Sequence, residues 1–273
     1  MELRTLGVDI GGTTWSVGRW DGDALQVIAT GVTGEHAPEE VRGLRSAIAQ
    51  ATVLGEPVDT VGVAFPGAVA KDGRVTDWPN RPRWVGAHLA SALGIGRDVR
   101  LEVTDDGVAA LRGETALGVG RGLSDVLLLT LGTGIGGGLL LDGRVRAPLP
   151  HDARTIGHLR ALPPDGVSHT RCSCDRTGCL QTALASLPDE RVLREQGLAA
   201  WPAGERLLDF LADLTRILAV PWLVLTGGLL CRDALREALT SGAADRGLTM
   251  RVPARPEQST LLGALAAGGW QHD

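Results

Sequence analysis

Apolar residues recur along the chain with two different periods, and their alternation predicts an α/β protein. Short apolar runs that end at glycine, proline or aspartate are typical of strands. Such runs occupy residues 3–11, 13–20, 24–31, 58–66, 99–104, 125–145 and 222–230, and the sixth is read as two strands joined by glycines. The segment Asp21-Gly22-Asp23 has the composition of a turn between the second and third strands.

Helical periodicity separates these strands. Val41, Leu44 and Ile48 have helical spacing within residues 38–52. Further helices are predicted at residues 84–93, 106–117, 205–220 and 259–269. Strand hairpins and helices alternate in two similar halves, although no sequence repeat is visible. We therefore expect a smaller α/β lobe at residues 1–104 and a larger α/β lobe at residues 105–273.

Composition and charge exclude several classes of protein. The 273 residues are 44% hydrophobic and 22% charged, a balance typical of globular proteins. The net charge of −5 and the absence of a basic block argue against nucleic-acid binding and against a polybasic membrane patch. No apolar run approaches the roughly 18 residues of a membrane span, and the first residues lack the layout of a signal peptide. We expect a cytoplasmic protein that binds neither nucleic acid nor membrane.

Three glycine turns follow apolar strands. They are Gly11-Gly12-Thr13 shortly after Asp9, Gly132-Thr133-Gly134 at mid-chain, and Thr226-Gly227-Gly228. Glycine lets backbone N–H groups approach a phosphate, and an aspartate just before such a turn can hold Mg²⁺ through water. An ordinary hairpin explains one Gly-Gly pair equally well, but three such turns favour a nucleotide site. Neither a Walker loop nor a dinucleotide fingerprint is present.

Two adjacent aspartates, Asp105 and Asp106, stand where a strand ends and a helix begins. A carboxylate at this junction could act as a general base on a rigid scaffold. Aspartate is also a good helix N-cap, which is the plainer interpretation of either residue alone. Two neighbours allow both roles, with one residue capping the helix and the other pointing inward.

A histidine and three cysteines have the spacing of a metal site. His158 is followed by Cys172, Cys174 and Cys179, and the three cysteines fall within eight residues. In a reducing compartment such clustering favours metal over a disulfide, and one imidazole with three thiolates completes a closed, structural Zn²⁺ site. A loop of free thiols is the alternative. Cys231 stands alone in an apolar stretch and is interpreted as a core residue.

In their order, these motifs resemble those of the ROK family (repressors, open reading frames and kinases), which contains bacterial sugar kinases of the actin-like ATPase (ribonuclease H-like) fold. The resemblance spans residues 5–186 and 205–268. It is carried by both phosphate loops, by Phe65-Pro66-Gly67, Trp78-Pro79-Asn80 and Gly157-His158, and by the zinc loop at residues 158–179.

The resemblance implies a two-lobed fold, a homodimer and a role for each motif. Asp106 would be the catalytic base, Asp9 would position Mg²⁺, and ATP would be bound by Gly11, Gly12, Thr13, Gly132, Thr133, Gly134, Gly227 and Gly228. The acceptor would be bound by Asn80, Asp105, Thr155, His158 and Gln181. His158 would also join Cys172, Cys174 and Cys179 in holding a structural Zn²⁺.

Three positions on the acceptor side depart from the family's pattern. Asp105 stands where the family usually has Asn, and Thr155 and Gln181 stand where it usually has Glu. The two glutamates would accept hydrogen bonds from sugar hydroxyls near the anomeric end, and a bond to such a charged group contributes about 1.5–3 kcal/mol. The phosphate motifs are intact, so we expect preserved phosphoryl transfer and an altered acceptor.

The resulting expectation is an ATP-dependent kinase for the primary hydroxyl of a sugar or sugar-like cyclitol. A 2-epi-5-epi-valiolone-type carbasugar of aminocyclitol antibiotic biosynthesis is the candidate acceptor. A conventional glucokinase, or an N-acetyl- or amino-hexose kinase, is one alternative, because it would share every phosphate motif. A non-catalytic sugar sensor is another. A family repressor needs an N-terminal helix-turn-helix, for which a phosphate loop starting at residue 7 leaves no room. Polyphosphate as donor fits poorly with a net charge of −5.

Overall fold

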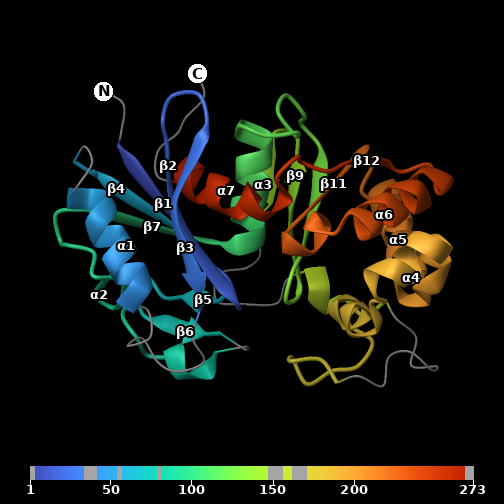
Figure 1. The fold of residues 1–273 in the computed structure, drawn as a ribbon, viewed down its shortest axis with the longest axis horizontal. Helices are drawn as coiled ribbons and strands as arrows, with labels where there is room; N and C mark the ends of the chain where they lie inside the picture. Colours follow the sequence, from blue (N-terminus) through green and yellow to red (C-terminus); the bar gives the residue numbers. More distant parts are fainter. Residues whose placement is uncertain are drawn as a thin grey trace. The chain divides into compact units, whose positions relative to one another are not determined.

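The computed structural model describes residues 4–33, 42–53, 57–78, 81–146, 156–161 and 171–267. The chain forms two compact units, and both are mixed α/β as the sequence predicts (Figure 1). The first unit holds the described residues up to Leu117 and those from Thr260 onward, and the second holds those from Gly118 to Ser259.

The sheet of the first unit has the strand order β3-β2-β1-β4-β7. Its strands are β1 (Thr5–Ile10), β2 (Thr14–Trp20), β3 (Leu25–Val32), β4 (Thr60–Phe65) and β7 (Arg100–Asp105). β1, β2 and β3 are antiparallel neighbours, whereas β1, β4 and β7 run parallel. The predicted turn between β2 and β3 is present, since Asp21 Oδ1 accepts hydrogen bonds from the backbone N–H groups of Asp23 and Ala24 at 3.1 and 2.9 Å.

Helices cover both faces of this sheet. Because side chains alternate along a strand, successive residues of β1 face different helices. Leu6, Val8 and Ile10 of β1 are buried in one core with Leu44 of α1 (Arg42–Val53). Gly7 faces the other way, and a Cβ there would lie 2.8 Å from the side chain of Leu265 in α7 (Ser259–Ala267). The missing side chain therefore lets α7 approach the sheet.

The C-terminal helix α7 and helix α3 (Asp106–Ala116) both belong to the first unit. Gly263 of α7 lies directly against the backbone of Ala109 in α3, where any larger residue would clash. Ala64, Ala109 and Ala264 form a small buried cluster at this junction. Because of this packing the two units differ from the lobes expected at residues 1–104 and 105–273.

The sheet of the second unit repeats the same topology in the order β10-β9-β8-β11-β12. Its strands are β8 (Val126–Leu131), β9 (Ile135–Leu141), β10 (Arg144–Arg146), β11 (Trp222–Thr226) and β12 (Thr249–Arg251). Again three antiparallel strands are followed by two parallel ones. The repeated architecture inferred from the two halves is therefore present, although the sequences do not repeat.

The α-helices in the described part of the second unit are α4 (Glu190–Gln196), α5 (Pro202–Ile217) and α6 (Asp233–Asp245). Leu127, Leu129 and Leu131 of β8 share a core with side chains of all three helices. In the part of the chain that the structure describes, no helix has the length and apolar content that spanning a bilayer requires.

Several expected elements change in the structure. The helix predicted at residues 84–93 is confined to α2 (Leu89–Leu93). Gly86 has a positive φ of 88°, which is not helical, so the helix begins only after it. Residues 64–84, rich in glycine and proline, are predicted to be a loop with a small hairpin, and that hairpin is present. It consists of β5 (Ala68–Val69) and β6 (Val75–Asp77), and a 3₁₀ turn follows at Pro82–Trp84. Cys231 was wrongly interpreted as a core residue. It is exposed, and its Sγ donates to Glu257 Oε2 at 3.3 Å.

Candidate functional site

The first glycine loop connects β1 to β2 at the carboxyl end of the parallel strands. Gly11 N donates to Thr14 O, and Thr33 N donates to Thr13 O, each at 2.8 Å. A Cβ at Gly11 would lie 2.9 Å from Thr14 O, so the tight turn requires glycine. Ligands of open α/β sheets bind at this edge, outside the carboxyl ends of parallel strands.

Three carboxyl groups lie at or next to the carboxyl ends of β1 and β7. Asp9 is the penultimate residue of β1 and is in register with Ala64, while Phe65 is in register with Asp105 at the end of β7. Asp105 caps α3, because its Oδ1 accepts from Val108 N at 3.1 Å. Asp106 begins the helix, and its Oδ1 accepts from Gly107 N at 2.7 Å. One aspartate thus caps the helix, which leaves Asp106 as the candidate base.

Burial raises the pKa of these carboxyl groups. The pKa of Asp9 rises to about 8, through desolvation first and the charge of Asp106 second. The pKa of Asp106 rises to about 7, through desolvation and then the neighbouring Asp105. Desolvation also raises the pKa of Asp105, opposed by its hydrogen bonds from the helix backbone. A carboxyl group with a pKa near neutrality is well matched to general-base work.

The carboxyl groups at this edge suit a Mg²⁺ ion that is bound together with substrate phosphates. Among the described residues, Asp9, Asp105 and Asp106 do not form a group whose ligand atoms converge on one point. Mg²⁺ usually keeps several waters and takes one or two carboxylates together with substrate phosphates. The donor set therefore suits a cation that arrives with a nucleotide better than one held by the protein alone.

The raised pKa of Asp9 gives a first prediction. A carboxyl group whose pKa is raised by folding stabilises the protein below its unfolded pKa of about 4, and that contribution is lost as the pH rises through about 8. We expect Asp9→Asn, which has no charge to desolvate, to raise the melting temperature at pH 8.5 in Mg²⁺-free buffer and to change it little at pH 4. Thermal unfolding at both pH values measures this. The exposed Asp98→Asn is the control, and an equal shift at both pH values would contradict the prediction.

The second glycine loop has the equivalent place in the second unit. Gly132–Gly134 connects β8 to β9, and Gly132 N donates to Gly134 O at 3.0 Å. Gly227, at φ 102°, lies directly against the backbone of Leu131 at the end of β8. At Gly132 and at Gly228, a Cβ would meet none of the described atoms within 4 Å. The two glycine turns are therefore neighbours with open space beside them, as a bound nucleotide requires.

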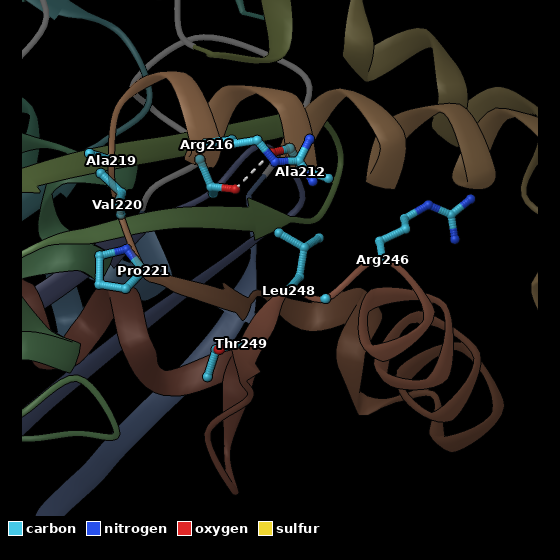
Figure 2. A pocket seen from close by; sticks show the side chains of 10 residues that line it. Ala212, Arg216, Ala219, Val220, Pro221, Arg246, Leu248 and Thr249 are labelled. Carbon is cyan, nitrogen blue, oxygen red and sulfur yellow. Dashed lines mark hydrogen bonds between the residues drawn. The ribbon is translucent and has the colours of Figure 1, made fainter.

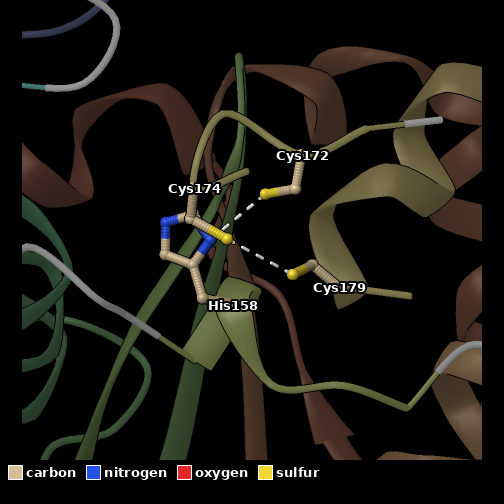
Figure 3. Close-up of side chains that lie close together, drawn as sticks. All are labelled: His158, Cys172, Cys174 and Cys179. Atoms are coloured by element: carbon tan, nitrogen blue, oxygen red, sulfur yellow. Dashed lines mark hydrogen bonds between the residues drawn. The ribbon is translucent and has the colours of Figure 1, made fainter. Parts of the chain in front are cut away.

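The predicted metal ligands also come together in the second unit (Figure 3). Ligand atoms of His158, Cys172, Cys174 and Cys179 lie within 4.8 Å of one another. His158 Nδ1 is 3.3 Å from Cys172 Sγ, and Cys174 Sγ is 3.6 Å from Cys179 Sγ. Burial and the neighbouring thiols raise the pKa of Cys179 to about 12, so its thiolate is unfavourable without a cation. A bound metal ion would stabilise the thiolate. One imidazole and three sulfurs at these separations fit a four-coordinate Zn²⁺.

Two side chains donate to this Cys₃His cluster. Arg176 Nε donates to Cys174 Sγ at 3.4 Å, and its Nη2 donates to the His158 carbonyl at 3.1 Å. Gln181 Nε2 donates to Cys172 Sγ at 3.0 Å and to Ser173 Oγ at 3.1 Å. The Gln181 Oε1 faces Gly134, where a Cβ would lie 3.1 Å away. Gln181, expected at the acceptor, thus lies between the cluster and the second glycine loop, while Arg176 was not singled out from the sequence.

The remaining predicted residues divide between the two units. Asp9, Gly11, Gly12, Thr13, Asp105 and Asp106 lie together in the first, and Gly132, Thr133, Gly134, Gly227, Gly228, His158 and Gln181 lie in the second. Asn80 and Thr155 fall outside the described residues. The roles assigned to all these residues stay predictions.

A separate cavity of about 300 Å³ in the second unit contains none of these residues (Figure 2). It is lined by the end of α5, by residues just before β11 such as Pro221, and by residues up to the first residue of β12, Thr249. That is the amino end of these parallel strands, opposite the edge where the glycine turns lie. Its Arg246 already pairs with Glu205 and Asp209. The cavity is therefore not the site that the motifs predict.

Comparison with known proteins agrees with the motifs. The ROK family model matches residues 5–199. The chain belongs to the ROK family. Kanosamine kinase of Amycolatopsis mediterranei is 37% identical over 187 residues, which are 67% of this chain and 59% of that protein. Glucokinase of Thermotoga maritima is 32% identical over 198 residues, 71% of this chain and 61% of that protein. These matches therefore span less than two thirds of the relatives' own length.

Solved ROK structures show the same fold. The ROK family glucokinase from Streptomyces griseus, in complex with glucose and AMPPNP, has a TM-score of 0.76 and 23% identity over 97% of this chain and 99% of its own. The ROK hexokinase from Thermus thermophilus has a TM-score of 0.70 and 25% identity over 97% of both chains. The family and the actin-like ATPase fold expected from the motifs are thereby confirmed.

Proposed function

We propose that this ROK protein is an ATP-dependent kinase that phosphorylates the primary hydroxyl of a sugar or a sugar-like cyclitol. The observation that carries this proposal is Asp106, a carboxyl group with a pKa near 7 at the carboxyl end of the strands, beside the first glycine loop. The named kinases among its relatives support it.

In the proposed reaction the acceptor oxygen attacks the γ-phosphorus of ATP. The bond between the γ-phosphorus and the β–γ bridging oxygen breaks, and ADP leaves. Asp106 accepts the hydroxyl proton during the attack. Backbone N–H groups of Gly12 and Gly134 would donate to phosphate oxygens, with the hydroxyls of Thr13 and Thr133. Gly11 and Gly132, whose N–H groups close the two turns, would set the shape of each loop. Asp9 would help to hold Mg²⁺, which would supply positive charge against the phosphate oxygens. Gly227 and Gly228 leave room for the adenosine side of the nucleotide.

A structural Zn²⁺ is the second part of the proposal. His158, Cys172, Cys174 and Cys179 would fill all four positions, so the ion would join the cysteine loop to the 3₁₀ helix Ile156–His158 and take no part in the reaction. Hydrogen bonds from Arg176 and Gln181 to two of the sulfurs support this, because such donors stabilise thiolate ligands.

We propose that the acceptor is a molecule whose anomeric end, or the equivalent end of a cyclitol, needs no hydrogen bond to a protein carboxylate. Gln181 offers an amide where the family usually has Glu, and its NH₂ is engaged with Cys172 and Ser173. Thr155 replaces the other glutamate. A valiolone-type cyclitol meets this requirement. An amino-hexose is the second candidate, because the relative with 37% identity is a kanosamine kinase. The expected homodimer stays a prediction.

An acceptor panel tests the function. With Mg·ATP, we expect a valiolone-type cyclitol to exceed glucose in kcat/KM by roughly a hundredfold, because two unmet hydrogen bonds cost about 1–3 kcal/mol each. Kanosamine and N-acetylglucosamine complete the panel, measured by ADP release.

Each outcome of the panel separates two hypotheses. Glucose better by tenfold or more would mean a conventional glucokinase, and kanosamine ahead of both would mean an amino-hexose kinase. Sugar binding without ADP release would mean a non-catalytic sensor. Gln181→Glu is the matched variant, and it should improve glucose relative to the cyclitol if this position sets the acceptor preference.

A further inference from the structure

Arg81 extends from the segment after Asn80 to the first glycine loop. Its Nη2 donates to the carbonyl oxygen of Gly12 at 2.5 Å and to that of Thr33 at 3.2 Å. Its own backbone is fixed as well, because Arg81 N donates to Trp78 O at 2.9 Å and Arg81 O accepts from Trp84 N at 3.0 Å. The guanidinium is therefore held in one place, directly against the loop.

Most of the hydrogen-bonding capacity of this guanidinium is unused. Arginine has five N–H donors, and among the described residues only Nη2 has acceptors. The buried Nε has no hydrogen-bond partner in the part of the chain that the structure describes. No carboxylate in the described part of the chain forms an ion pair with Arg81, although the side chain is partly buried. By contrast, Arg246 is partly buried between two carboxylates.

Two neighbouring residues also carry unsatisfied polar groups. Among the described residues, Thr33 Oγ1 and Trp78 Nε1 are buried without a hydrogen-bond partner. The Thr33 carbonyl accepts from the guanidinium of Arg81, and the Trp78 carbonyl accepts from the Arg81 backbone N–H. A buried polar group without a partner destabilises the folded protein, so the buried Nε of Arg81 calls for an acceptor. Because the guanidinium of Arg81 is positively charged, we expect this acceptor to be an anion.

We infer that Arg81 binds an oxygen of the phosphoryl group that is transferred, at the first glycine loop. The inference rests on the proposed kinase function. A phosphoryl group suits this place, because its oxygens accept hydrogen bonds both from backbone N–H groups of the loop and from a guanidinium. Arg81 keeps its proton throughout, because it only donates hydrogen bonds while the acceptor's proton goes to Asp106. Its charge stabilises the negative charge that spreads over the phosphoryl oxygens in the transition state.

Kinetics and binding test this role. Arg81→Gln should lower kcat by at least about a hundredfold, the scale for losing one preorganised donor to a developing charge. It should also weaken binding of Mg·pyrophosphate, measured by calorimetry, by tenfold or more while leaving adenosine binding intact. Arg81→Lys keeps the charge without the planar fork and should fall between wild type and Arg81→Gln. Arg83→Gln, an exposed arginine on the same 3₁₀ turn, should change neither quantity.

The results separate the inference from the proposed function. Pyrophosphate binding by Arg81→Gln equal to wild type, or an equal loss of pyrophosphate and adenosine binding, overturns the inference and leaves Arg81 as a support for the loop carbonyls. A wild-type protein that phosphorylates no acceptor but needs Arg81 for pyrophosphate refutes the kinase proposal alone. Should Arg81→Gln not fold, Arg81→Lys gives the same comparison, with melting curves to verify its fold.

Discussion

Asp106→Asn is expected to lower kcat by at least about a hundredfold while ATP still binds. The asparagine side chain has nearly the same size but cannot accept the proton of the attacking hydroxyl. In the wild type, kcat/KM should rise as the pH passes about 7, because the base works only when ionised and burial raises its pKa to that range. That rise should disappear in the variant. Steady-state kinetics from pH 5.5 to 8.5, with nucleotide binding measured separately, test both expectations.

Asp105→Asn is the matched comparison, because the two aspartates are adjacent and only Asp105 caps α3. Asparagine is an equally good cap, so this variant should keep its stability and lose less activity than Asp106→Asn. Normal turnover by Asp106→Asn would reject the assignment of the base. A larger loss at position 105 than at position 106 would move the catalytic role to the neighbouring residue.

The strands and glycine turns were predictable because their signals are local. Each run of alternating or continuous apolar residues that predicted a strand is a strand, and the turn at Asp21-Gly22-Asp23 is set by side-chain hydrogen bonds within four residues. The equivalence of the two halves followed from the order of these local elements alone. Helix α6 was missed, although Leu235 and Leu239 have helical spacing and are buried.

The side-chain network around the site was not predictable, because it depends on contacts distant in sequence. Arg81 reaches Gly12 across 69 residues, and no local pattern distinguishes it from the exposed Arg83 two positions later. Gln181 was expected at the acceptor, yet its amide bonds to Cys172 and Ser173 once the cysteine loop folds back. Likewise, the sequence places a carboxyl group at position 9, but only the neighbouring Asp106 and the surrounding burial raise its pKa.

Cys174→Ser is expected to abolish zinc binding and to destabilise the second unit. A serine hydroxyl is a poor Zn²⁺ ligand, and the three remaining ligands would no longer close the site. Metal binding contributes directly to folding, so we expect a loss of about 3 kcal/mol or more, equivalent to a melting temperature lower by roughly 6–12 °C for a chain of this size. Elemental analysis should find one zinc per wild-type chain and none in the variant.

Cys231→Ser is the control for this substitution, because Cys231 is exposed and lies outside the Cys₃His cluster. It should keep one zinc per chain and melt with the wild type. Removing the metal from the wild type with a chelator should lower its melting temperature toward that of Cys174→Ser and should not shift the variant, since the variant has no ion to lose. Freshly purified wild-type protein without zinc, or a chelator shift of equal size in both proteins, would show that the cluster is a loop of free thiols. The loss in Cys174→Ser would then come only from the contacts of Cys174 with Arg176 and Cys179.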